Sequence, residues 1–383
     1  MSLDRYTSWV EINRDALVNN VRRFKNHIGA GVRLAAVVKA NAYGHGLVQA
    51  SGIVLEAGAD WLAVNSIEEA AALRKAGIQA PVLCLAYIPL AALEDAVDLD
   101  VRLTVSSRET IEKLGEIAAR RALPARVHLK VETGTNRQGA SGDALLELAR
   151  AAARFPGVVL EGLSTHYANI EDVTEHDYAE KQLDNFLEAG EMLAAAGIRI
   201  PVRHTACTAA AILFPRTLFN LARVGIGLYG LWPSKETRIS ALQAGIRLNE
   251  LSPVLTWKAR VAQIKTVPPG ASIGYGCTDL ATQETRLAVL PIGYYEGYDR
   301  RLSSIGYVLI RGRRAPVRGR VCMNMTMVDV TSIPQASLED EAILLGRQGG
   351  DAVSAETLAG KTGSINYEII AGINPALPRV IVP

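Results

Sequence analysis

The sequence predicts an α/β fold in which an eight-stranded parallel (β/α) barrel is followed by a mainly antiparallel β domain. Short apolar segments alternate with helix-like segments between about residues 33 and 230, as in repeated βα units. The apolar segments are hydrophobic throughout, which indicates strands buried on both faces. After Trp232-Pro233 the pattern changes to the period-two alternation of antiparallel strands. We therefore place the barrel at residues 1–240 and the β domain at residues 241–383.

The expected barrel strands are short and rich in β-branched residues or leucine. They are residues 34–38, 61–64, 82–86, 101–105, 127–131, 159–164, 202–206 and 221–225. The segments between them have helical character. In SIEEAAALRKAG, Ser66 and Glu69 have the spacing of a capping box and Gly77 ends the segment. Eight parallel strands in about 200 to 250 residues fit a closed barrel, and an open doubly wound sheet is the alternative.

The C-terminal part reads as an all-β domain. SPVLTWKARVAQIKTV alternates apolar and polar residues, and Pro268-Pro269-Gly270 then turns the chain. Further strand-like runs follow at residues 286–295, 306–319 and 321–330. Alternation of this kind is typical of antiparallel strands that bury one face.

Composition points to a small-molecule ligand. The 383 residues carry 41 Lys and Arg against 39 Asp and Glu, a net charge of +2, so no overall field attracts nucleic acid or an anionic membrane. The arginine-rich run RGRRAPVRGR lacks interleaved aromatics, which favours a solvated hairpin over a nucleic-acid surface. Four separated cysteines form no CxxC pair, which argues against disulfides and a zinc site. We expect no metal.

The predicted location is the cytoplasm. The first twenty residues contain charges and no apolar core of the kind that a signal peptide has. The longest apolar run, residues 82–93, is interrupted by Pro89 and is shorter than the roughly 20 residues of a membrane span. We therefore expect no membrane partner.

Reactive groups in a closed βα barrel gather where the strands end. Lys39 follows the first apolar strand, where desolvation would lower the pKa of its amine and favour a Schiff base; a lysine that extends to solvent is the alternative. After the eighth strand, Gly225 to Gly230 read GxGxxG. A dinucleotide fingerprint would open a helix in an N-terminal βαβ unit, so a phosphate-binding turn fits this position better. Together these features predict a ligand with an aldehyde and a phosphate.

The chain resembles the alanine racemases, a family of pyridoxal-phosphate enzymes, and the matching motifs occur in the family's order. VVKANAYGHG is similar to the motif of the cofactor lysine, ARVGIGLYG to the phosphate and pyridine segment, and SIGYGCTD to the segment of the second catalytic base. PIGYYEGY and GRVCMNMTMVDV resemble signatures of the β domain, and INYEII resembles the segment of a C-terminal tyrosine. The matches extend over nearly the whole chain.

The resemblance implies a set of cofactor contacts. Lys39 would bind pyridoxal phosphate covalently and Arg223 would face its pyridine nitrogen. Because a guanidinium does not protonate that nitrogen as an aspartic acid could, the ring would be a weaker electron sink and side reactions such as transamination would be suppressed. The implied phosphate contacts are Tyr43, Tyr367, Thr208 and the backbone N–H groups of Gly225 and Ile226.

Racemisation needs proton-transfer groups on both faces of one carbon. The resemblance implies that Lys39 acts on D-alanine and that Tyr275, contributed by a partner chain, acts on L-alanine, which makes the protein a homodimer with shared active sites. In relatives a histidine links this tyrosine to the arginine that faces the pyridine, and His166 and Arg223 match those residues. Taken alone, His166 would be interpreted as a core histidine.

Further residues match the family's substrate site. Lys130 would be carbamylated and bridge to Arg137, which would orient the substrate carboxylate. A plain strand lysine beside a loop arginine is the alternative. Met323 would offer a backbone N–H to the same carboxylate, and Tyr294 and Arg320 would line the substrate entrance.

Three positions depart from the commonest family pattern. Cys207 replaces the usual asparagine, Asn136 lies in Gly134-Thr135-Asn136-Arg137 where the usual motif is GMGR, and Asn324 replaces an aspartate. These changes leave open a broader, serine-tolerant racemase. A decarboxylase of the same fold is disfavoured by Arg223, since such enzymes pair the pyridine nitrogen with a carboxylate. A non-catalytic cofactor carrier would need neither the β domain nor Tyr275.

Overall fold

The computed structural model describes residues 5–246, 248 and 251–383. The chain divides into two compact units. The barrel unit is Ala16–Ala42 with Leu47–Ser252, and the β unit is Met1–Asp15, Tyr43–Gly46 and Pro253–Pro383. The N-terminal segment, which the sequence-based boundaries group with the barrel, thus belongs to the β unit. The boundary expected near residue 240 falls inside helix α10 (Lys235–Gln243) of the barrel unit.

The barrel unit contains the eight expected parallel strands, and this part of the fold prediction is confirmed. They are β2 (Arg33–Val37), β3 (Trp61–Val64), β4 (Val82–Cys84), β5 (Val101–Val105), β6 (Ala125–Lys130), β7 (Val158–Ser164), β8 (Val202–His204) and β9 (Leu221–Val224). Their order is β8-β7-β6-β5-β4-β3-β2-β9. The two ends of this path approach each other, because the N–H of Arg223 donates to the carbonyl of Ala206 at 3.1 Å.

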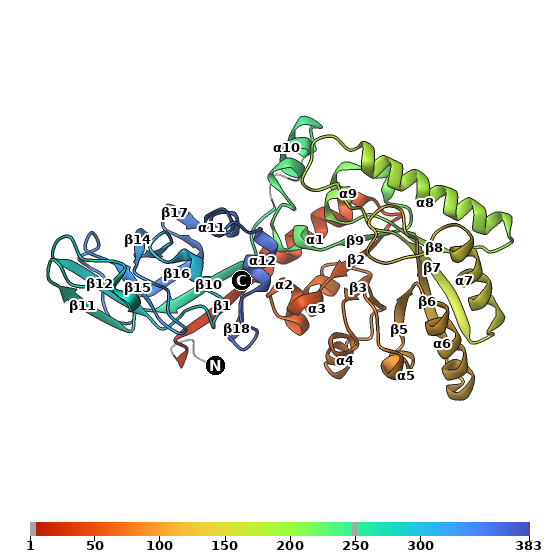
Figure 1. The fold of residues 1–383 in the computed structure, drawn as a ribbon, viewed down its shortest axis with the longest axis horizontal. Helices are drawn as coiled ribbons and strands as arrows, with labels where there is room; N and C mark the ends of the chain where they lie inside the picture. The colour runs from red at the N-terminus through yellow and green to blue at the C-terminus, as the bar shows by residue number, and fades with distance from the viewer. Residues whose placement is uncertain (1–4, 247, 249–250) are drawn as a thin grey trace. The chain divides into compact units, whose positions relative to one another are not determined.

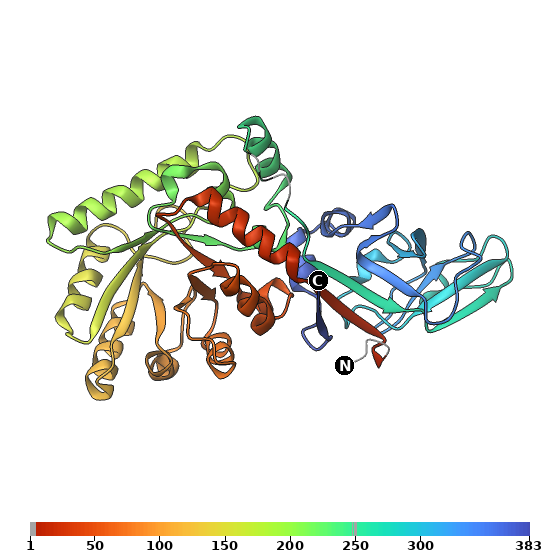
Figure 2. The same ribbon diagram turned by 180° about the vertical axis from the view of Figure 1, so that it is seen from behind.

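Helices connect the strands and lie outside them (Figure 1). They are α1 (Arg14–Ile28), α3 (Leu47–Glu56), α4 (Ile67–Lys75), α5 (Leu93–Asp98), α6 (Arg108–Arg121), α7 (Gly142–Arg154), α8 (Asp177–Ala195) and α9 (Thr208–Leu213), with short 3₁₀ turns at Leu90–Ala92, Pro215–Thr217 and Ile226–Tyr229. Helix α1, in full view in Figure 2, buries Leu17, Val21 and Phe24. One hydrophobic cluster inside the sheet consists of Ala35, Trp61, Leu83, Val202 and Leu221. Packed side chains therefore fill the interior of the barrel.

The start of α4 differs in one detail from a capping box. The Ser66 hydroxyl accepts the N–H of Glu69 at 3.4 Å, as expected of an N-cap. The Glu69 carboxylate instead accepts the N–H of Asn65 at 2.8 Å and the N–H of Ala40 at 2.6 Å. Glu69 therefore ties the start of α4 to the segment that follows Lys39.

The β unit is mainly antiparallel, as predicted. Its strands are β1 (Ser8–Asn13), β10 (Leu255–Arg260), β11 (Gln263–Val267), β12 (Thr285–Leu290), β13 (Tyr307–Ile310), β14 (Arg313–Arg318), β15 (Thr326–Asp329), β16 (Glu341–Gln348), β17 (Asp351–Val353) and β18 (Arg379–Val382). The order is β11-β12-β15-β14-β13-β16-β10-β1-β18, with β17 paired to β16. Strand β1 runs beside β10 and pairs in parallel with β18 (Figure 1).

The β unit is not all-β, contrary to expectation. It contains α11 (Ala355–Thr362) and α12 (Asn366–Ala371), and the motif INYEII lies at α12. The arginine-rich run is largely paired with carboxylates. Arg311 lies 2.6 Å from Asp340, Arg314 lies 2.6 Å from Asp351, and Arg318 lies 2.8 Å from Asp279. These ion pairs account for the concentration of charge on the β13–β14 hairpin.

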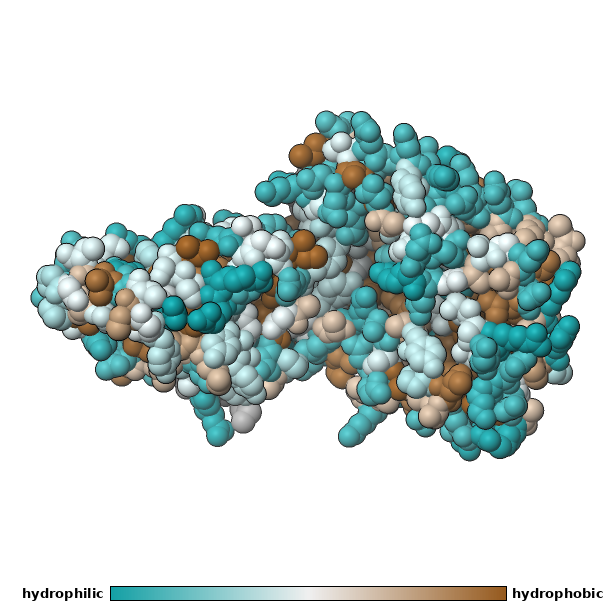
Figure 3. Space-filling model, viewed as in Figure 1, coloured by the Kyte–Doolittle hydropathy of each residue, from teal (hydrophilic) through white to brown (hydrophobic). Residues whose placement is uncertain are grey.

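Among the residues that the structure describes, none belongs to a helix long and apolar enough to cross a membrane. On the face drawn in Figure 3, hydrophobic side chains lie scattered among hydrophilic ones. Isolated surface hydrophobics of this kind are normal in folded proteins.

Candidate active site

Lys39 lies directly after the buried strand β2, at the C-terminal end of the barrel. Burial lowers the pKa of its amine from the ordinary value, and the positive charge of Arg137 lowers it further, while Glu69 opposes the shift. A neutral, nucleophilic amine is therefore more abundant here than on a solvent-exposed lysine. This environment fits the Schiff-base role better than it fits a lysine extended into water.

The chain after Lys39 forms a left-handed turn, which the sequence did not predict. Ala40, Asn41 and Ala42 have φ of 54, 55 and 53° and ψ of 52, 43 and 50°, and Tyr43 has φ of 53°. Each such residue other than glycine costs about 1–2 kcal/mol. Hydrogen bonds hold the turn: the Ala42 N–H donates to the Val38 carbonyl at 2.7 Å, and the Leu47 N–H donates to Asn41 Oδ1 at 2.8 Å. The strain is thus distributed over the segment that orients Lys39.

Arg223 on β9 is buried, and both terminal nitrogens of its guanidinium donate hydrogen bonds. Its Nη1 donates to His204 Nδ1 at 2.7 Å and to the His204 carbonyl at 2.8 Å. Its Nη2 donates to the carbonyls of Thr165 at 2.9 Å and Thr205 at 3.0 Å. Burial lowers the pKa of the guanidinium to about 10, which still leaves it charged at neutral pH. The cation is therefore fixed in position by four acceptors.

His166 follows β7, and its backbone carbonyl accepts the Thr135 hydroxyl at 2.6 Å. The pKa of its ring is well below the ordinary value, first because of burial and then because of Arg223 and Lys130. The imidazole is therefore neutral among cations. The histidine that Arg223 contacts through the hydrogen bonds above is His204, a residue that the sequence analysis did not single out. The only feature of the sequence that could have indicated a role for His204 was its position in the seventh expected strand.

The glycine-rich turn offers free amides. The Gly225 N–H donates to Thr208 Oγ1 at 3.0 Å, so this amide, expected to bind phosphate, already has a partner. Ile226 and Gly227 are buried at the start of the 3₁₀ turn, and neither N–H has an acceptor among the residues that the structure describes. Two orphaned buried donors beside the Thr208 hydroxyl suit an anionic phosphate. The turn therefore fits the phosphate of the expected cofactor.

Gly227 allows this turn to pack closely. A Cβ here would lie 2.5 Å from the Phe24 ring and 2.8 Å from Thr208 Cγ2. We therefore expect Gly227→Ala to weaken pyridoxal-phosphate binding about tenfold or more, a loss of about 1.4 kcal/mol. The measurement is a spectroscopic titration of the apoprotein with the cofactor. Gly52→Ala is the control, since a Cβ at Gly52 meets open space. Equal affinity of Gly227→Ala and wild type would place the phosphate elsewhere.

Lys130 ends β6 in a strongly cationic environment. Its pKa is well below the ordinary value, because of burial first and then Arg223 and Arg137. A neutral amine beside two arginines favours conversion to an anionic carbamate. The loop that leads to Arg137 is tight, and Asn136 has φ of 53°. Asparagine and glycine tolerate this left-handed backbone, so the departure at Asn136 preserves the conformation of the loop.

Cys207 lies at the N-terminal end of α9 and is partly exposed. Burial of its sulfur raises the pKa of the thiol to about 11. The side chain is therefore a neutral, weakly polar group at physiological pH.

Four of the residues expected at the substrate site lie together on the β unit. Tyr275 begins a 3₁₀ turn and is 72% exposed, and it lines a surface hollow of about 880 Å³ with Tyr294, Arg320 and Met323. The Arg320 guanidinium packs closely against Gly276, because a Cβ there would lie 2.8 Å from Nη1. The structure thus brings these four residues to one face.

Asn324 lies in the same hollow, and its amide donates to Glu296 Oε1 at 2.6 Å. An aspartate at this position would face the Glu296 carboxylate, so asparagine removes a repulsion between like charges. Elsewhere in the β unit, Tyr43 and Tyr367, expected at the phosphate, have ring centroids 6.1 Å apart.

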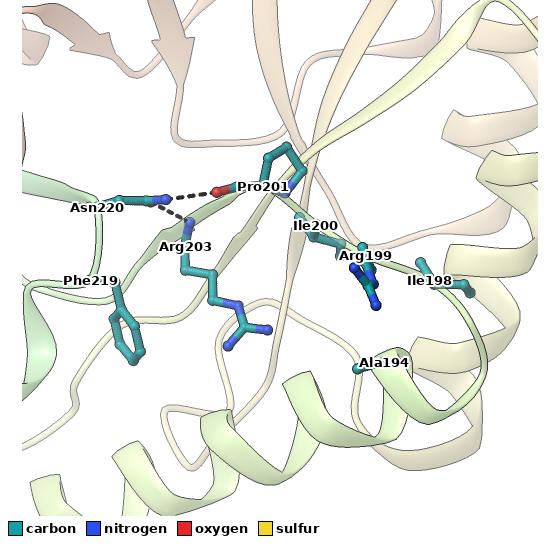
Figure 4. Close-up of a pocket in the computed structure, with 8 residues that line it drawn as sticks. All are labelled: Ala194, Ile198, Arg199, Ile200, Pro201, Arg203, Phe219 and Asn220. Carbon is teal, nitrogen blue, oxygen red and sulfur yellow. Dashed lines mark hydrogen bonds between the residues drawn. The ribbon is translucent and has the colours of Figure 1, made fainter.

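A further pocket, of about 440 Å³, lies at the opposite end of the barrel from Lys39, beside the N-terminal ends of β8 and β9 (Figure 4). Asn220 bridges the two strands there, since its Nδ2 donates to the Pro201 carbonyl at 2.7 Å and its Oδ1 accepts the Arg203 N–H at 2.8 Å. Catalytic groups of βα barrels lie at the other end. We therefore infer that this pocket lies where β8 and β9 close the barrel and that it is not part of the active site.

Three histidines, two of them buried and one partly buried, make the barrel sensitive to acid. The pKa values of His128, His166 and His204 are lowered, in each case chiefly by burial. Below about pH 6.5 the unfolded chain therefore binds protons that the folded chain does not, and stability falls. We expect the free energy of unfolding to drop by up to about 1.4 kcal/mol per histidine for each pH unit below this value. Urea denaturation at pH 7.5 and 5.5 measures the effect, and identical free energies would contradict it.

An eight-stranded parallel barrel with a half-buried lysine after its first strand, a fixed arginine and a glycine-rich turn, followed by a β domain, fits the class of pyridoxal-phosphate-dependent amino-acid racemases. Family comparison agrees: residues 12–233 match the N-terminal domain of alanine racemase and residues 254–381 match its C-terminal domain. The chain belongs to the alanine racemase family, whose members depend on pyridoxal phosphate.

Three proteins illustrate what the chain is similar to. An alanine racemase of Leptospira interrogans is 38% identical over 382 residues, covering 99% of this chain and 97% of its own. The crystal structure of an alanine racemase from Bacillus anthracis with bound L-Ala-P is 36% identical with a TM-score of 0.92, covering 98% of this chain and 95% of its own. A histidine racemase of Leuconostoc mesenteroides is 27% identical with a TM-score of 0.88, covering 99% of each chain. The same fold thus serves different amino acids.

Proposed function

We propose that this protein interconverts L-alanine and D-alanine with pyridoxal phosphate, with Lys39 and Tyr275 of the partner subunit as the two proton-transfer groups. The observations that carry the proposal are a half-buried lysine of lowered pKa in the barrel unit and, on the β unit, an exposed tyrosine. Tyr275 lines a hollow with other expected substrate groups, and a second copy of the chain would provide the site that this face completes. The proposed assembly is therefore a homodimer with two shared sites.

Several residues fit the cofactor. Lys39 would anchor it, and Thr208, Ile226, Tyr43 and Tyr367 would bind its phosphate, with Gly225 orienting Thr208 through the hydrogen bond described above. Arg223 would face the pyridine nitrogen. When bound, pyridoxal phosphate withdraws electrons from an attached amino acid and makes its α-hydrogen acidic.

The protein's own groups then determine where the proton goes. The neutral amine of Lys39 can accept a proton at Nζ from one face of the α-carbon and return it there. The phenol of Tyr275 of the partner subunit would serve the opposite face. His166 stays neutral among the surrounding cations, so it can accept or donate a hydrogen bond without adding another positive charge. Two groups on opposite faces give inversion, which one group alone cannot.

Arg137, Met323 and Lys130 would hold the substrate carboxylate. The Arg137 guanidinium and the Met323 N–H are donors, and a carbamate on Lys130 would supply the anion that orients Arg137. Tyr294 and Arg320 would line the entrance to the site.

Lys130→Ala tests this arrangement. Loss of a charge-assisted hydrogen bond of about 1.5–3 kcal/mol should raise the KM for alanine at least about tenfold. Steady-state kinetics in both directions, with the exposed Lys181→Ala as a matched control, measure the change. Unchanged alanine affinity and rate in Lys130→Ala would show that no carbamate orients Arg137.

A chiral assay of the purified protein tests the function itself. With added pyridoxal phosphate, L-alanine should become a nearly equal mixture of the enantiomers, faster than L-serine, L-histidine or L-lysine. Preference for serine or histidine would favour a broader racemase, a possibility that the histidine racemase of similar fold supports. Release of carbon dioxide from L-lysine without inversion would instead identify a decarboxylase.

A further inference from the structure

A chain of buried hydrogen bonds runs through the barrel from Arg223 to a carboxylate. Arg223 Nη1 lies 2.7 Å from His204 Nδ1, His204 Nε2 lies 2.7 Å from His128 Nδ1, and His128 Nε2 lies 3.1 Å from Glu161 Oε2. His128 is 0% exposed and His204 is 1% exposed. The chain therefore links the proposed cofactor arginine to Glu161 without an intervening water.

Only one arrangement of protons satisfies every bond in this chain. A guanidinium can only donate, so His204 Nδ1 must be unprotonated and its Nε2 must carry hydrogen. That hydrogen points at His128 Nδ1, which must accept, so His128 carries its own hydrogen on Nε2 and donates to Glu161. Both rings are thus neutral Nε2–H tautomers, and every donor points from Arg223 toward the carboxylate.

The charges around the chain agree with this arrangement. Burial and then the Arg223 charge keep the pKa of His204 well below the ordinary value, and burial also lowers that of His128 despite its bond to Glu161. Burial alone would raise the pKa of Glu161, but His128 and Arg102 together lower it. Arg102 Nε lies 3.3 Å from Glu161 Oε2. Glu161 is therefore ionised and can only accept.

The local structure of the sheet brings the members of the hydrogen-bond chain together. The register between β6 and β7 shifts at His128, which pairs with Gly162 after Val127 pairs with Leu160, so Glu161 is the extra residue of a bulge. Gly162 leaves room for the imidazole, because a Cβ there would lie 2.1 Å from His128 Nδ1. An edge-to-face contact with Trp61, with centroids 5.8 Å apart, holds the other side of the ring.

We propose that Glu161, His128 and His204 are positioning residues that act through Arg223 on the pyridine nitrogen of the cofactor. Glu161 provides the terminal acceptor, which fixes both ring tautomers and leaves His204 Nδ1 free to hold the guanidinium. This inference rests on the proposed function for its catalytic consequence but not for the hydrogen-bond chain itself. Loss of the carboxylate loosens Arg223, which changes the electronic environment of the cofactor without touching the substrate.

Neutron diffraction from the deuterated full-length protein tests the proton positions in the hydrogen-bond chain independently of catalysis. We expect deuterium on Nε2 of both His128 and His204 and none on either Nδ1. Deuterium on Nδ1 of either ring would overturn the proposal. The measurement is informative even if the protein racemises no amino acid. An error in the proposed function can therefore be distinguished from an error in the proposed hydrogen-bond chain.

Glu161→Leu, which removes the acceptor, and Glu161→Gln, which keeps an oxygen but loses the charge, test the consequence. In Glu161→Leu, kcat should fall about ten- to a hundredfold with an unchanged KM for alanine, and the visible absorption of the cofactor should shift in a pH titration. Glu161→Gln should show a smaller change in the same direction and provides the test if the leucine variant does not fold. The exposed Glu188→Gln is the control and should match wild type. Folded Glu161 variants with wild-type kcat and absorption would refute the role.

Discussion

Coexpression of Lys39→Ala and Tyr275→Ala chains is expected to restore about a quarter of the wild-type racemase activity, although each variant alone is inactive. Random pairing makes half of the dimers mixed, and one of the two sites in a mixed dimer receives an intact Lys39 and an intact Tyr275. The physical basis is that racemisation needs both faces of the α-carbon served. The unfractionated mixture is assayed with L-alanine for this quarter. Differently tagged chains purified by two affinity steps leave only mixed dimers, and these should show about half of the wild-type activity.

The control for this experiment is coexpression of Lys39→Ala with itself under a second tag. These doubly tagged dimers should remain inactive, which excludes recovery through assembly alone. If mixed dimers form in the expected proportion and still show no activity, the two groups do not meet across subunits. Tyr275 would then act within its own chain or not at all.

Arg223→Leu is expected to destabilise the folded protein by about 3–5 kcal/mol and to lower kcat by at least about a thousandfold. The stability loss arises because His204 Nδ1 and the carbonyls of Thr165, His204 and Thr205 lose their buried donor. The loss of rate arises because a fixed charge at the proposed cofactor ring disappears. Urea denaturation of the apoprotein and steady-state kinetics of the holoenzyme measure the two effects separately.

Arg216→Leu is the matched control for the loss of an arginine. Arg216 is exposed in the 3₁₀ turn Pro215–Thr217, so its removal should change stability by no more than about 0.5 kcal/mol. Comparable stability of Arg223→Leu and Arg216→Leu would mean that the buried hydrogen bonds of Arg223 contribute nothing. A folded Arg223→Leu protein with normal kcat would remove Arg223 from the proposed mechanism.

The barrel could be predicted because its signal is local. Each of the eight apolar runs and each helical connection can be recognised from its own short segment of sequence. The ends of the apolar runs indicate where Lys39, Lys130 and Arg223 lie. The position of β1 could not be predicted in this way. Its partners, β10 and β18, are more than 240 residues away in sequence, and nothing in the first fifteen residues specifies them.

The details of the candidate site depend on geometry that composition does not encode. The turn after Lys39 uses two alanines in left-handed conformations, which alanine disfavours, so the surrounding hydrogen bonds impose the shape. The link from Arg223 to His204 arises from the approach of β8 and β9, and its continuation to Glu161 depends on a bulge in β7. Sequence patterns indicate strands, but they do not locate a single extra residue within one.

Borohydride reduction of the purified protein with pyridoxal phosphate, followed by peptide mapping, tests most directly whether Lys39 is the cofactor lysine. The proposal predicts a visible absorption band before reduction and a stable cofactor adduct on the peptide that contains Lys39, with none on that peptide in Lys39→Ala. A colourless protein with no adduct, or an adduct confined to other lysines, would contradict it.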